Sequence, residues 1–332
     1  MTDGVGRGPG GGALPEAEGD LGAALRRAAA ILAEAGVPSP RVDAELLAEH
    51  LLAHAPAGDL LGGGGLGRLR ALAIAGHPVP DGFWDLVAER ARRVPLQHLT
   101  GRAPFRHLTL AVGPGVFVPR PETECVVQVA LDWIAEHFPP ALAPAPEDAA
   151  DAAGPARAGR RPVVVDLGTG SGAIAASVAH EVPGAVVHAV ELSELAHAWA
   201  ARNLALPEVG GRVRLVRGDL RTALPELDGT VDVVVTNPPY IPPDMVPRDP
   251  EAALHDPEMA LYGGADGGLE LPLAAAATAA RLLVPGGFLV MEHAEVQAGR
   301  IAGRLASSPH WTEVRSHTDL NGLPRATSAV RR

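Results

Sequence analysis

The stretch that decides the fold runs from Pro162 to Val182 and reads PVVVDLGTGSGAIAASVAHEV. Its three consecutive valines, Val163 to Val165, predict a buried strand because β-branched side chains favour extended backbone. Glycines at 168, 170 and 172 follow at once, and an alanine-rich segment of helical character completes the stretch. A strand, a glycine loop and a helix in this order begin a βαβ unit, whose loop lets the backbone approach a ligand closely.

The same alternation of strand and helix continues to the end of the chain. Helices are predicted over residues 171–182, 194–206 and 270–283, and strands over 185–193, 212–219, 231–237, 286–293, 311–320 and 325–332. Continuous apolar strands between helices predict a parallel sheet that helices cover on both faces. The predicted fold class is therefore α/β.

A helical pattern precedes this sheet. Apolar residues recur every three or four positions over residues 21–36, and similar segments predict a helical domain from residue 19 to residue 94. The run from Gly58 to Gly76 is rich in glycine, so we expect a loop between helices there.

A linker over residues 95–120 is expected to join the helical domain to the α/β domain, which we place at residues 121–332. Apolar residues on both sides of Gly113-Pro114-Gly115 predict a β-hairpin that turns at these three residues. Two segments of biased composition stand apart from the domains. Residues 1–18 are predicted to form a flexible tail, and residues 139–161 a disordered insertion.

Composition excludes several classes of protein. The chain has 332 residues, of which 47% are hydrophobic and 20% charged, so it is globular, with length for one large and one smaller domain. Its net charge of −11 argues against non-specific binding to duplex DNA, which needs clustered basic residues. Cys125 is the only cysteine, so no internal disulfide forms and no structural zinc site is expected. Without an apolar run of ~18 residues or a signal-peptide core, we expect a cytoplasmic protein that binds neither metal nor membrane.

The glycine loop is followed by an acid at the spacing expected of a nucleoside-binding site. Glu191 ends the next strand, close to the ~20 residues that separate such a loop from a ribose-binding carboxylate. The loop reads Gly-x-Gly-x-Gly, and not the Gly-x-Gly-x-x-Gly that seats a pyrophosphate. This spacing resembles the S-adenosylmethionine loop of Rossmann-like class I methyltransferases. In that family Asp219, after the third strand, would lie near the adenine, although a solvated loop acid explains Asp219 equally well.

Asn237-Pro238-Pro239-Tyr240 follows the fourth strand, at the carboxyl edge of the sheet beside the loop. The Asn237 Oδ1 and the Pro238 carbonyl could accept the two N–H groups of a planar –NH₂, and Tyr240 could stack on its plane. A planar amide nitrogen is a weak nucleophile, so two acceptors that orient it would assist its methylation. The alternative is a structural Pro-Pro turn, which we set aside because of the loop, the acid on the second strand and the aspartate that leads the fourth strand.

Six motifs make the resemblance specific: PLQHLTG at 95–101, VPRPETE at 118–124, DLGTGSGAIA at 166–175, TNPPYI at 236–241, ALYGGADGGLE at 260–270 and MEHAEVQ at 291–297. With them the chain resembles the release-factor glutamine N5-methyltransferase family (PrmC/HemK). The resemblance implies methyl transfer from S-adenosylmethionine to the glutamine of the Gly-Gly-Gln motif in peptide chain release factors. We further expect a monomer whose partner is a protein and not a nucleic acid, and a helical domain at residues 19–94 that recognises this substrate.

The resemblance assigns residues to two sites. The cofactor site would contain Gly168, Thr169, Gly170, Ser171, Gly172, Glu191, Asp219, Leu220 and Asn237. The glutamine site would contain Asn237, Pro238, Pro239 and Tyr240, with Asn237, Pro238 and Tyr240 as the catalytic residues. Leu220 stands where the family often has Trp, so stacking on the adenine is not assured there.

Three charged residues of the second motif remain open between two roles. Arg120, Glu122 and Glu124 could close over the cofactor or the substrate backbone, or they could form a helix N-terminus in which Pro121 occupies the first turn. Other functions also remain open at this point: a ribosomal-protein glutamine methyltransferase, an adenine-N6 nucleic-acid methyltransferase, and an adaptor with a degenerate cofactor domain. The net charge of −11 argues against the nucleic-acid enzyme.

Overall fold

The computed structural model describes residues 19–54, 65–138 and 160–332. The tail predicted at residues 1–18 and the insertion predicted at 139–161, except for its last two residues, lie outside the described residues. The chain divides into two compact units, Met1–Thr100 and Gly101–Arg332. Within the described ranges, no helix combines the length and the apolar character that crossing a membrane requires.

The first unit is helical. Its helices are α1 (Leu21–Glu34), α2 (Pro40–His54), α3 (Leu66–Ile74), α4 (Phe83–Ala91) and α5 (Leu96–Thr100). The side chain of Asp20 caps α1 by accepting the Ala23 N–H at 2.8 Å, and the helices enclose a core that includes Leu32, Leu47 and Phe83. Helix α3 occupies part of the run from 58 to 76 for which a loop was predicted, because Leu69 and Leu72 bury against this core.

The second unit begins with a two-stranded hairpin whose turn was predicted in the wrong place. Strands β1 (Arg102–Phe105) and β2 (Leu108–Ala111) pair in antiparallel fashion, so the chain turns at Arg106 and His107 and not at residues 113–115. Gly113 instead lies against the Trp199 ring, where an added Cβ would come within 2.6 Å of the indole. The glycine therefore serves a close approach between segments and not the turn itself.

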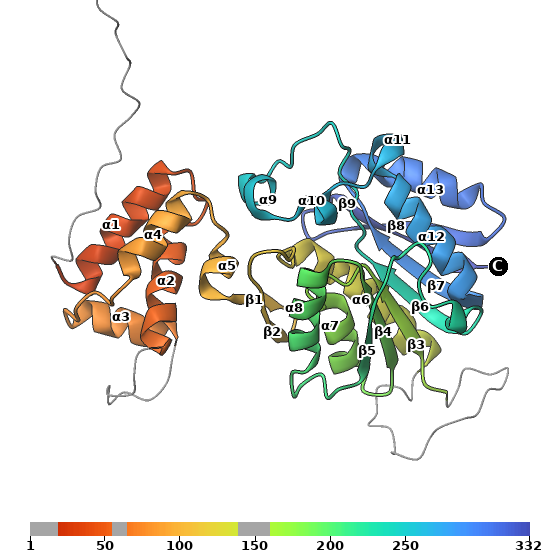
Figure 1. Cartoon of the computed structure of the whole chain (residues 1–332), viewed down its shortest axis with the longest axis horizontal. Helices are drawn as coiled ribbons and strands as arrows, with labels where there is room; N and C mark the ends of the chain where they lie inside the picture. Colours follow the sequence, from red (N-terminus) through yellow and green to blue (C-terminus); the bar gives the residue numbers. More distant parts are fainter. Residues whose placement is uncertain (1–18, 55–64, 139–159) are drawn as a thin grey trace, which may run out of the picture. The chain divides into compact units, whose positions relative to one another are not determined.

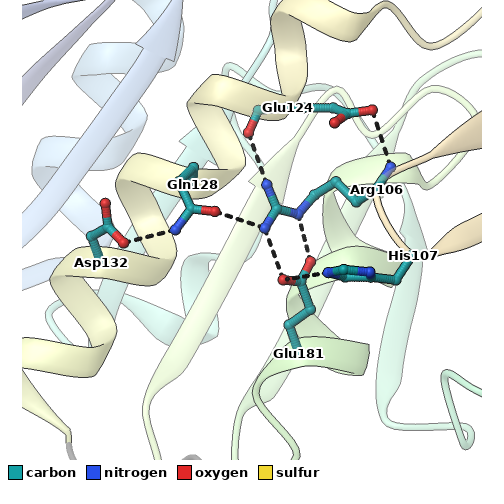
Figure 2. A network of polar contacts seen from close by, with 6 residues as sticks. All are labelled: Arg106, His107, Glu124, Gln128, Asp132 and Glu181. Carbon is teal, nitrogen blue, oxygen red and sulfur yellow. Dashed lines mark hydrogen bonds and ion pairs between the residues drawn. The ribbon is translucent and has the colours of Figure 1, made fainter.

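Arg106 occupies the turn with a positive φ of 50°, a conformation that is unfavourable for residues other than glycine. Hydrogen bonds made by its polar groups offset this energetic cost. Its backbone N–H donates to Glu124 at 3.1 Å, and its guanidinium donates to both carboxylate oxygens of Glu181 at 2.5 and 2.8 Å. Figure 2 shows the same guanidinium reaching Gln128 and the Glu124 carbonyl on helix α6 (Pro121–His137). These contacts fix the hairpin to helices α6 and α7 (Ala173–Glu181) of the same unit.

A seven-stranded sheet forms the centre of this unit, in the order β5-β4-β3-β6-β7-β9-β8 (Figure 1). Its strands are β3 (Val163–Leu167), β4 (Val186–Glu191), β5 (Val213–Arg217), β6 (Val231–Thr236), β7 (Leu283–Glu292), β8 (Trp311–Thr318) and β9 (Pro324–Arg331). The first five strands in this order are parallel, as predicted, whereas β9 runs antiparallel to both β7 and β8.

Helices cover both faces of the sheet, as the uninterrupted apolar strands predicted (Figure 1). One face packs on α6, α7 (Ala173–Glu181) and α8 (Glu194–Leu204), and the other on α12 (Glu270–Leu282) and α13 (Ala298–Ala306). The short helices α9 (Pro250–His255), α10 (Glu258–Leu261) and α11 (Ala265–Gly268) follow β6, and the 3-10 turns η2 (Pro225–Leu227) and η3 (Glu295–Gln297) complete the unit. This arrangement brings the loops after β3, β4, β5, β6 and β7 to one edge of the sheet.

Candidate active site

A cavity of about 830 Å³ opens at the carboxyl ends of the parallel strands. Its volume is within the range of small-molecule sites, roughly 300–1,000 Å³. Most residues that the sequence assigned to the site line it, namely Gly168, Thr169, Gly170, Ser171, Glu191, Asp219, Leu220, Asn237, Pro239 and Tyr240. Gly172 and Pro238 are not among its lining residues, and Pro238 is buried.

The glycine loop is shaped by a buried carboxylate. Asp166 is fully buried at the end of β3, and its Oδ2 accepts from the Thr169 hydroxyl at 2.5 Å and from the Ala175 N–H at 3.1 Å. Burial raises the pKa of Asp166 to about 7, against these two hydrogen bonds, which lower it. The loop between them turns sharply, since Gly168, Gly170 and Gly172 all have positive φ. Asp166 therefore connects the loop to the first turn of α7.

Glu191 holds the neighbouring part of the loop. One carboxylate oxygen accepts the Gly170 N–H at 2.8 Å, and the other accepts the Ser193 N–H at 2.7 Å. Each oxygen retains a lone pair, because a carboxylate can accept about four hydrogen bonds in all. The side chain lines the cavity, so both oxygens remain available to the hydroxyl groups of a ribose.

Asp219 and Leu220, in the loop after β5, form another part of the cavity wall. The hydrogen bond with Arg221 holds the pKa of Asp219 below its usual range, and Arg221 donates to both of its oxygens at 2.6–3.0 Å. Leu220 approaches Gly168 and packs partly against the core. An apolar side chain beside a carboxylate suits a planar base with polar edges, so these residues fit the nucleoside part of S-adenosylmethionine.

The backbone after Asn237 is fixed from several sides. The Tyr240 and Ile241 N–H groups donate to the Leu261 carbonyl at 3.2 and 2.8 Å, and the Gln297 side chain donates to the Tyr240 carbonyl at 2.7 Å. Gly263 lies so close that an added Cβ would come within 2.7 Å of the Pro239 carbonyl oxygen. Within the described part of the chain no donor bonds to the Pro238 carbonyl oxygen or to Asn237 Oδ1.

Four polar side chains meet behind this segment. Asn237 donates through Nδ2 to the Thr123 hydroxyl oxygen at 3.2 Å, and the Tyr240 hydroxyl donates to Glu292 Oε1 at 3.4 Å. Burial raises the pKa of Glu292 to about 7, whereas the nearby Thr123 hydroxyl and the charge of Arg325 lower it. Burial also raises the pKa of the Tyr240 hydroxyl above its usual range, and the charge of Glu292 acts in the same direction. Tyr240 is therefore a protonated donor at neutral pH.

The structure shows both features considered for Arg120, Glu122 and Glu124, a helix start and a place at the cavity. Pro121 occupies the first turn of α6 and Arg120 its N-cap position, so the helix-start pattern is confirmed. Arg120 also lines the cavity and binds Asp256 at 2.9 Å and Asp249 at 3.3 Å, which ties the segment after β6 to α6. Glu122 lines the cavity, whereas Glu124 binds the hairpin through Arg106.

One acid that supported the sequence argument lies elsewhere. Asp232 leads β6, but it is at the amino end of the strand, opposite the cavity, where it binds Arg160 and accepts the Val163 N–H at 2.9 Å. The lining residues that received no role from the sequence include Thr123, Glu292 and Arg325. Glu292 carried a signal, since like Glu191 it is an acid at the end of a buried strand. Thr123 stands in the VPRPETE motif, but the motif gave it no role, because its partner Asn237 is 114 positions away.

Metal ligation has no obvious place in this site. In the part of the chain that the structure describes, no group of three or more His, Cys, Asp or Glu side chains is arranged to hold a metal ion. The lining groups instead offer carboxylate and carbonyl acceptors, an apolar wall and the ring of Tyr240. This set fits S-adenosylmethionine, whose ribose hydroxyls need acceptors and whose sulfonium is attracted to a π face.

Comparisons with known proteins agree with this geometry. The PrmC N-terminal domain family matches residues 23–101, and the methyltransferase small domain family matches residues 155–246. The chain is 47% identical to the release factor glutamine methyltransferase of Streptomyces coelicolor, over 90% of this chain and 93% of that protein. It is 40% identical to the release factor glutamine methyltransferase of Bifidobacterium longum, over 92% of this chain and 98% of that protein.

A further relative carries a different substrate in its name. The 4-amino-L-phenylalanine/4-methylamino-L-phenylalanine methyltransferase of Streptomyces pristinaespiralis is 38% identical, over 91% of this chain and 92% of that protein. The family match and the sheet with its N-terminal helices together confirm the predicted Rossmann-like class I methyltransferase fold.

Proposed function

The chain belongs to the family of release factor glutamine methyltransferases, and from this premise we propose that it methylates the side-chain nitrogen N5 of a glutamine. The methyl donor is S-adenosylmethionine, and the glutamine is that of the Gly-Gly-Gln motif of peptide chain release factors. The observation that carries the proposal is that no donor of the described residues bonds to Oδ1 of the cavity residue Asn237 or to the carbonyl oxygen of its neighbour Pro238.

These acceptors match the two N–H groups of a primary amide. Asn237 Oδ1 and the Pro238 carbonyl would each accept one of them, which orients the nitrogen and favours a tetrahedral geometry in which its lone pair is less delocalised and points to the methyl group. In the transfer the amide nitrogen forms a bond to the methyl carbon while the carbon–sulfur bond of the sulfonium breaks. The nitrogen then loses one proton to solvent, which leaves N5-methylglutamine and S-adenosylhomocysteine.

The other cavity residues divide between cofactor and substrate. Glu191 would accept from the ribose hydroxyls, the loop from Gly168 to Gly172 would pass along the methionine and ribose portions, and Leu220 would cover the adenine beside Asp219. Tyr240 would pack on the plane of the glutamine amide. The Tyr240 hydroxyl bond to Glu292 supports this role, because it holds the far end of the ring in place.

Exposed apolar side chains around the cavity favour a protein substrate over a free amino acid. Met245, Val246, Met259, Val296 and Leu323 all line the cavity, and between 39% and 73% of each side chain is exposed. Apolar residues grouped at the rim of a site commonly contact a macromolecular partner. A protein loop that carries its target glutamine into the cavity would cover them, whereas a single amino acid would not.

One relative supports a second candidate. An aromatic amine such as the side chain of 4-amino-L-phenylalanine also presents a planar –NH₂, so the same acceptors could hold it. The rim residues argue against this candidate, since a free amino acid leaves them exposed. A ribosomal protein with a target glutamine remains a third candidate, which differs from the first only in the partner.

The proposal is tested by supplying labelled S-adenosylmethionine and purified substrates. A release factor is compared with the same factor carrying alanine in place of the Gly-Gly-Gln glutamine, and separate reactions contain ribosomal proteins and free 4-amino-L-phenylalanine. We expect label in the glutamine form of the release factor alone. Equal labelling of the glutamine and alanine forms would overturn the assigned target, and label only in another reaction would transfer the assignment to that substrate.

A further inference from the structure

The side chain of Gln297 joins three of the motifs that the sequence singled out. Gln297 ends the motif MEHAEVQ, and its Nε2 donates to the carbonyl oxygens of Tyr240 at 2.7 Å and Gly267 at 3.0 Å. Tyr240 belongs to TNPPYI, and Gly267 belongs to ALYGGADGGLE. The other polar atom of the amide, Oε1, accepts the Ala294 N–H at 3.1 Å. The proposed transfer gives Gln297 and Gly267 no role.

These three bonds use the full set of groups that a glutamine amide offers. The –NH₂ group has two hydrogens, and each goes to a carbonyl, while the oxygen takes an N–H. Gln297 is 2% exposed, so water has little access to replace them. A glutamate of the same shape cannot donate while it is ionised, and a methionine has no N–H at all. The site therefore requires the donors of glutamine and not only its volume.

The Tyr240 carbonyl depends on Gln297 for its hydrogen bond. Among the described residues no backbone N–H donates to this oxygen, and an added Cβ on Gly268 would come within 2.2 Å of it. The N–H groups of Tyr240 and Ile241 already donate to the Leu261 carbonyl, at 3.2 and 2.8 Å. With the carbonyl bonded as well, the peptide groups on both sides of the Tyr240 Cα are held. The direction in which the ring leaves the backbone is held with them.

The Gly267 carbonyl belongs to a loop with an unfavourable backbone conformation. Asp266 and Gly267 both have positive φ, of 56° and 62°, which is costly for the aspartate. The Asp266 carboxylate is held from outside by Arg300 of α13 at 2.6 Å. Gln297 holds the same loop from inside, through an amide that also bonds Tyr240. The loop and the Tyr240 backbone are thus supported together.

We propose that Gln297 is a positioning residue that fixes the backbone at Tyr240, so that the Tyr240 ring keeps its place against the amide to be methylated. The inference rests on the proposed function, which gives the ring that role. Gln297 is not among the residues that line the cavity, so it acts through Tyr240. Its three bonds involve no residue assigned to the cofactor. Loss of the amide should therefore affect the rate of transfer and not cofactor binding.

Amide hydrogen exchange tests the backbone without any substrate. Four of the residues from Asn237 to Pro243 are prolines, which have no N–H, so after Asn237 only Tyr240 and Ile241 report in this segment. Gln297→Met keeps the length of the side chain and removes both donors. Exchange at these two amides should become at least about tenfold faster. Unchanged exchange would overturn the inference, because Tyr240 would then be held without Gln297.

Kinetics test whether this position matters for transfer. With release factor, kcat of Gln297→Met should fall about 10- to 100-fold, since a displacement of about 1 Å can cost as much as 100-fold. KM for S-adenosylmethionine should stay within about threefold of the unmodified protein. Full kcat despite faster exchange would remove Gln297 from the reaction. A rise in KM as large as the fall in kcat would assign it to cofactor binding instead, and both results contradict the proposal.

Arg212→Met is a matched control for lost stability. The Arg212 side chain also donates to two backbone carbonyls, those of Ala179 at 2.8 Å and Glu208 at 3.3 Å, and it lies outside the cavity lining. This variant should leave kcat, and the exchange of the segment that contains Tyr240, within about twofold. Equal effects of Arg212→Met and Gln297→Met would attribute both to general destabilisation and refute the positioning role.

A second substitution separates hydrogen bonding from packing. Gln297→Glu keeps the volume and an acceptor for the Ala294 N–H, but while ionised it has no hydrogen for the two carbonyls. It should raise exchange and lower kcat as Gln297→Met does, and it decides the matter if the Met variant does not fold. Exchange and kcat within about twofold of the unmodified protein would assign Gln297 to packing alone.

Failure of the proposed function gives a different result from failure of this inference. If the unmodified protein is inert toward release factor, the assigned substrate is wrong, while exchange at Tyr240 and Ile241 still decides whether Gln297 holds the backbone. The kinetic comparison is then made on whichever labelled substrate the protein does methylate. Full activity of Gln297→Met on that substrate would refute the positioning role.

Discussion

The substitution Asn203→Asp should destabilise the protein by an amount that grows with pH. Asn203 is 1% exposed on α8, and its Nδ2 donates to the carbonyl oxygens of Ala111 at 2.9 Å and Ser171 at 2.8 Å. Its Oδ1 accepts the Ala111 N–H at 2.7 Å, so one amide joins the hairpin to the glycine loop. Aspartate has nearly the same shape, but when it is ionised its second carboxylate oxygen faces the carbonyl oxygens of Ala111 and Ser171. None of these three oxygens can donate a hydrogen bond.

The magnitude follows from the two ways in which the folded protein can respond. If the introduced carboxyl group stays ionised, two hydrogen bonds of about 1 kcal/mol each are lost and carboxylate–carbonyl repulsion is added, giving roughly 3–5 kcal/mol. If it takes a proton, one donor is restored. Protonation costs about 1.4 kcal/mol for each unit by which pH exceeds an ordinary aspartate pKa of about 3.9, or about 1.5 kcal/mol at pH 5 and 5–6 kcal/mol at pH 8.

The sign of the pH dependence is fixed by linkage. The folded variant holds its proton at pH values where the unfolded chain has lost it, so the pKa is raised in the folded state and stability falls as pH rises above about 4. We therefore expect a loss of about 2–3 kcal/mol at pH 5, from protonation and one lost hydrogen bond, and of about 3–5 kcal/mol at pH 8. Urea unfolding followed by circular dichroism measures both, as differences from the unmodified protein at the same pH.

Asn203→Ala provides the control, since it loses both Nδ2 bonds and the bond from the Ala111 N–H, and it introduces no group that titrates. Its destabilisation should be nearly equal at pH 5 and pH 8. If the Asp and Ala variants lose the same stability at both pH values, the amide does not bridge the two carbonyls, and the assignment of its oxygen and nitrogen is wrong.

Three further predictions concern the site and the hairpin. Glu191→Ala should weaken S-adenosylmethionine binding roughly 10- to 100-fold in calorimetry, because two charge-assisted bonds to the ribose are lost. An affinity within twofold of the unmodified protein would place the ribose elsewhere. Arg106→Met should lower the free energy of unfolding by about 2–4 kcal/mol, because the largely buried Glu181 loses both bonds to the guanidinium and keeps the more distant His107 Nε2 at 3.7 Å. Cofactor affinity measured alongside should stay within about threefold, and a much larger change would extend the role of the hairpin to the cavity. Tyr240→Phe should reduce kcat less than about tenfold, since the hydroxyl bond to Glu292 is long at 3.4 Å. Tyr240→Ala, which removes the ring, should reduce kcat more than about 100-fold. Equal losses in the two variants would assign the function to the hydroxyl.

The fold could be predicted because its signals are local. Uninterrupted valines mark β3 and β6, and the change from strand to helix recurs at each loop, so each element is visible within its own segment. The direction of β9 cannot be read from its own segment, since it depends on which strands β9 pairs with in the folded sheet. The hairpin turn was wrong for a similar reason. Gly113 and Gly115 look like turn residues, but their space is taken by Trp199 and Leu195 of the α8 region.

The site could be predicted as far as linear motifs place residues at the ends of strands. The glycine loop, Glu191 and Asn237 follow β3, β4 and β6, and parallel strands bring such ends together. The same argument failed for Asp232, an acid of the same type at the opposite end of β6. Sequence reasoning missed Thr123, Glu292 and Asn203, because their partners lie 32 to 114 residues away and become neighbours only in the folded sheet.

The two glutamates at the ends of strands in this cavity differ in what their partners can do. Glu191 is held by the N–H groups of Gly170 and Ser193, whose direction is fixed by the backbone. Glu292 is held by the Tyr240 hydroxyl at 3.4 Å, and a hydroxyl hydrogen can rotate. Fixed oxygens suit a cofactor that must bind in one pose, whereas Glu292 meets the cavity through Tyr240, the residue proposed to pack on the substrate amide.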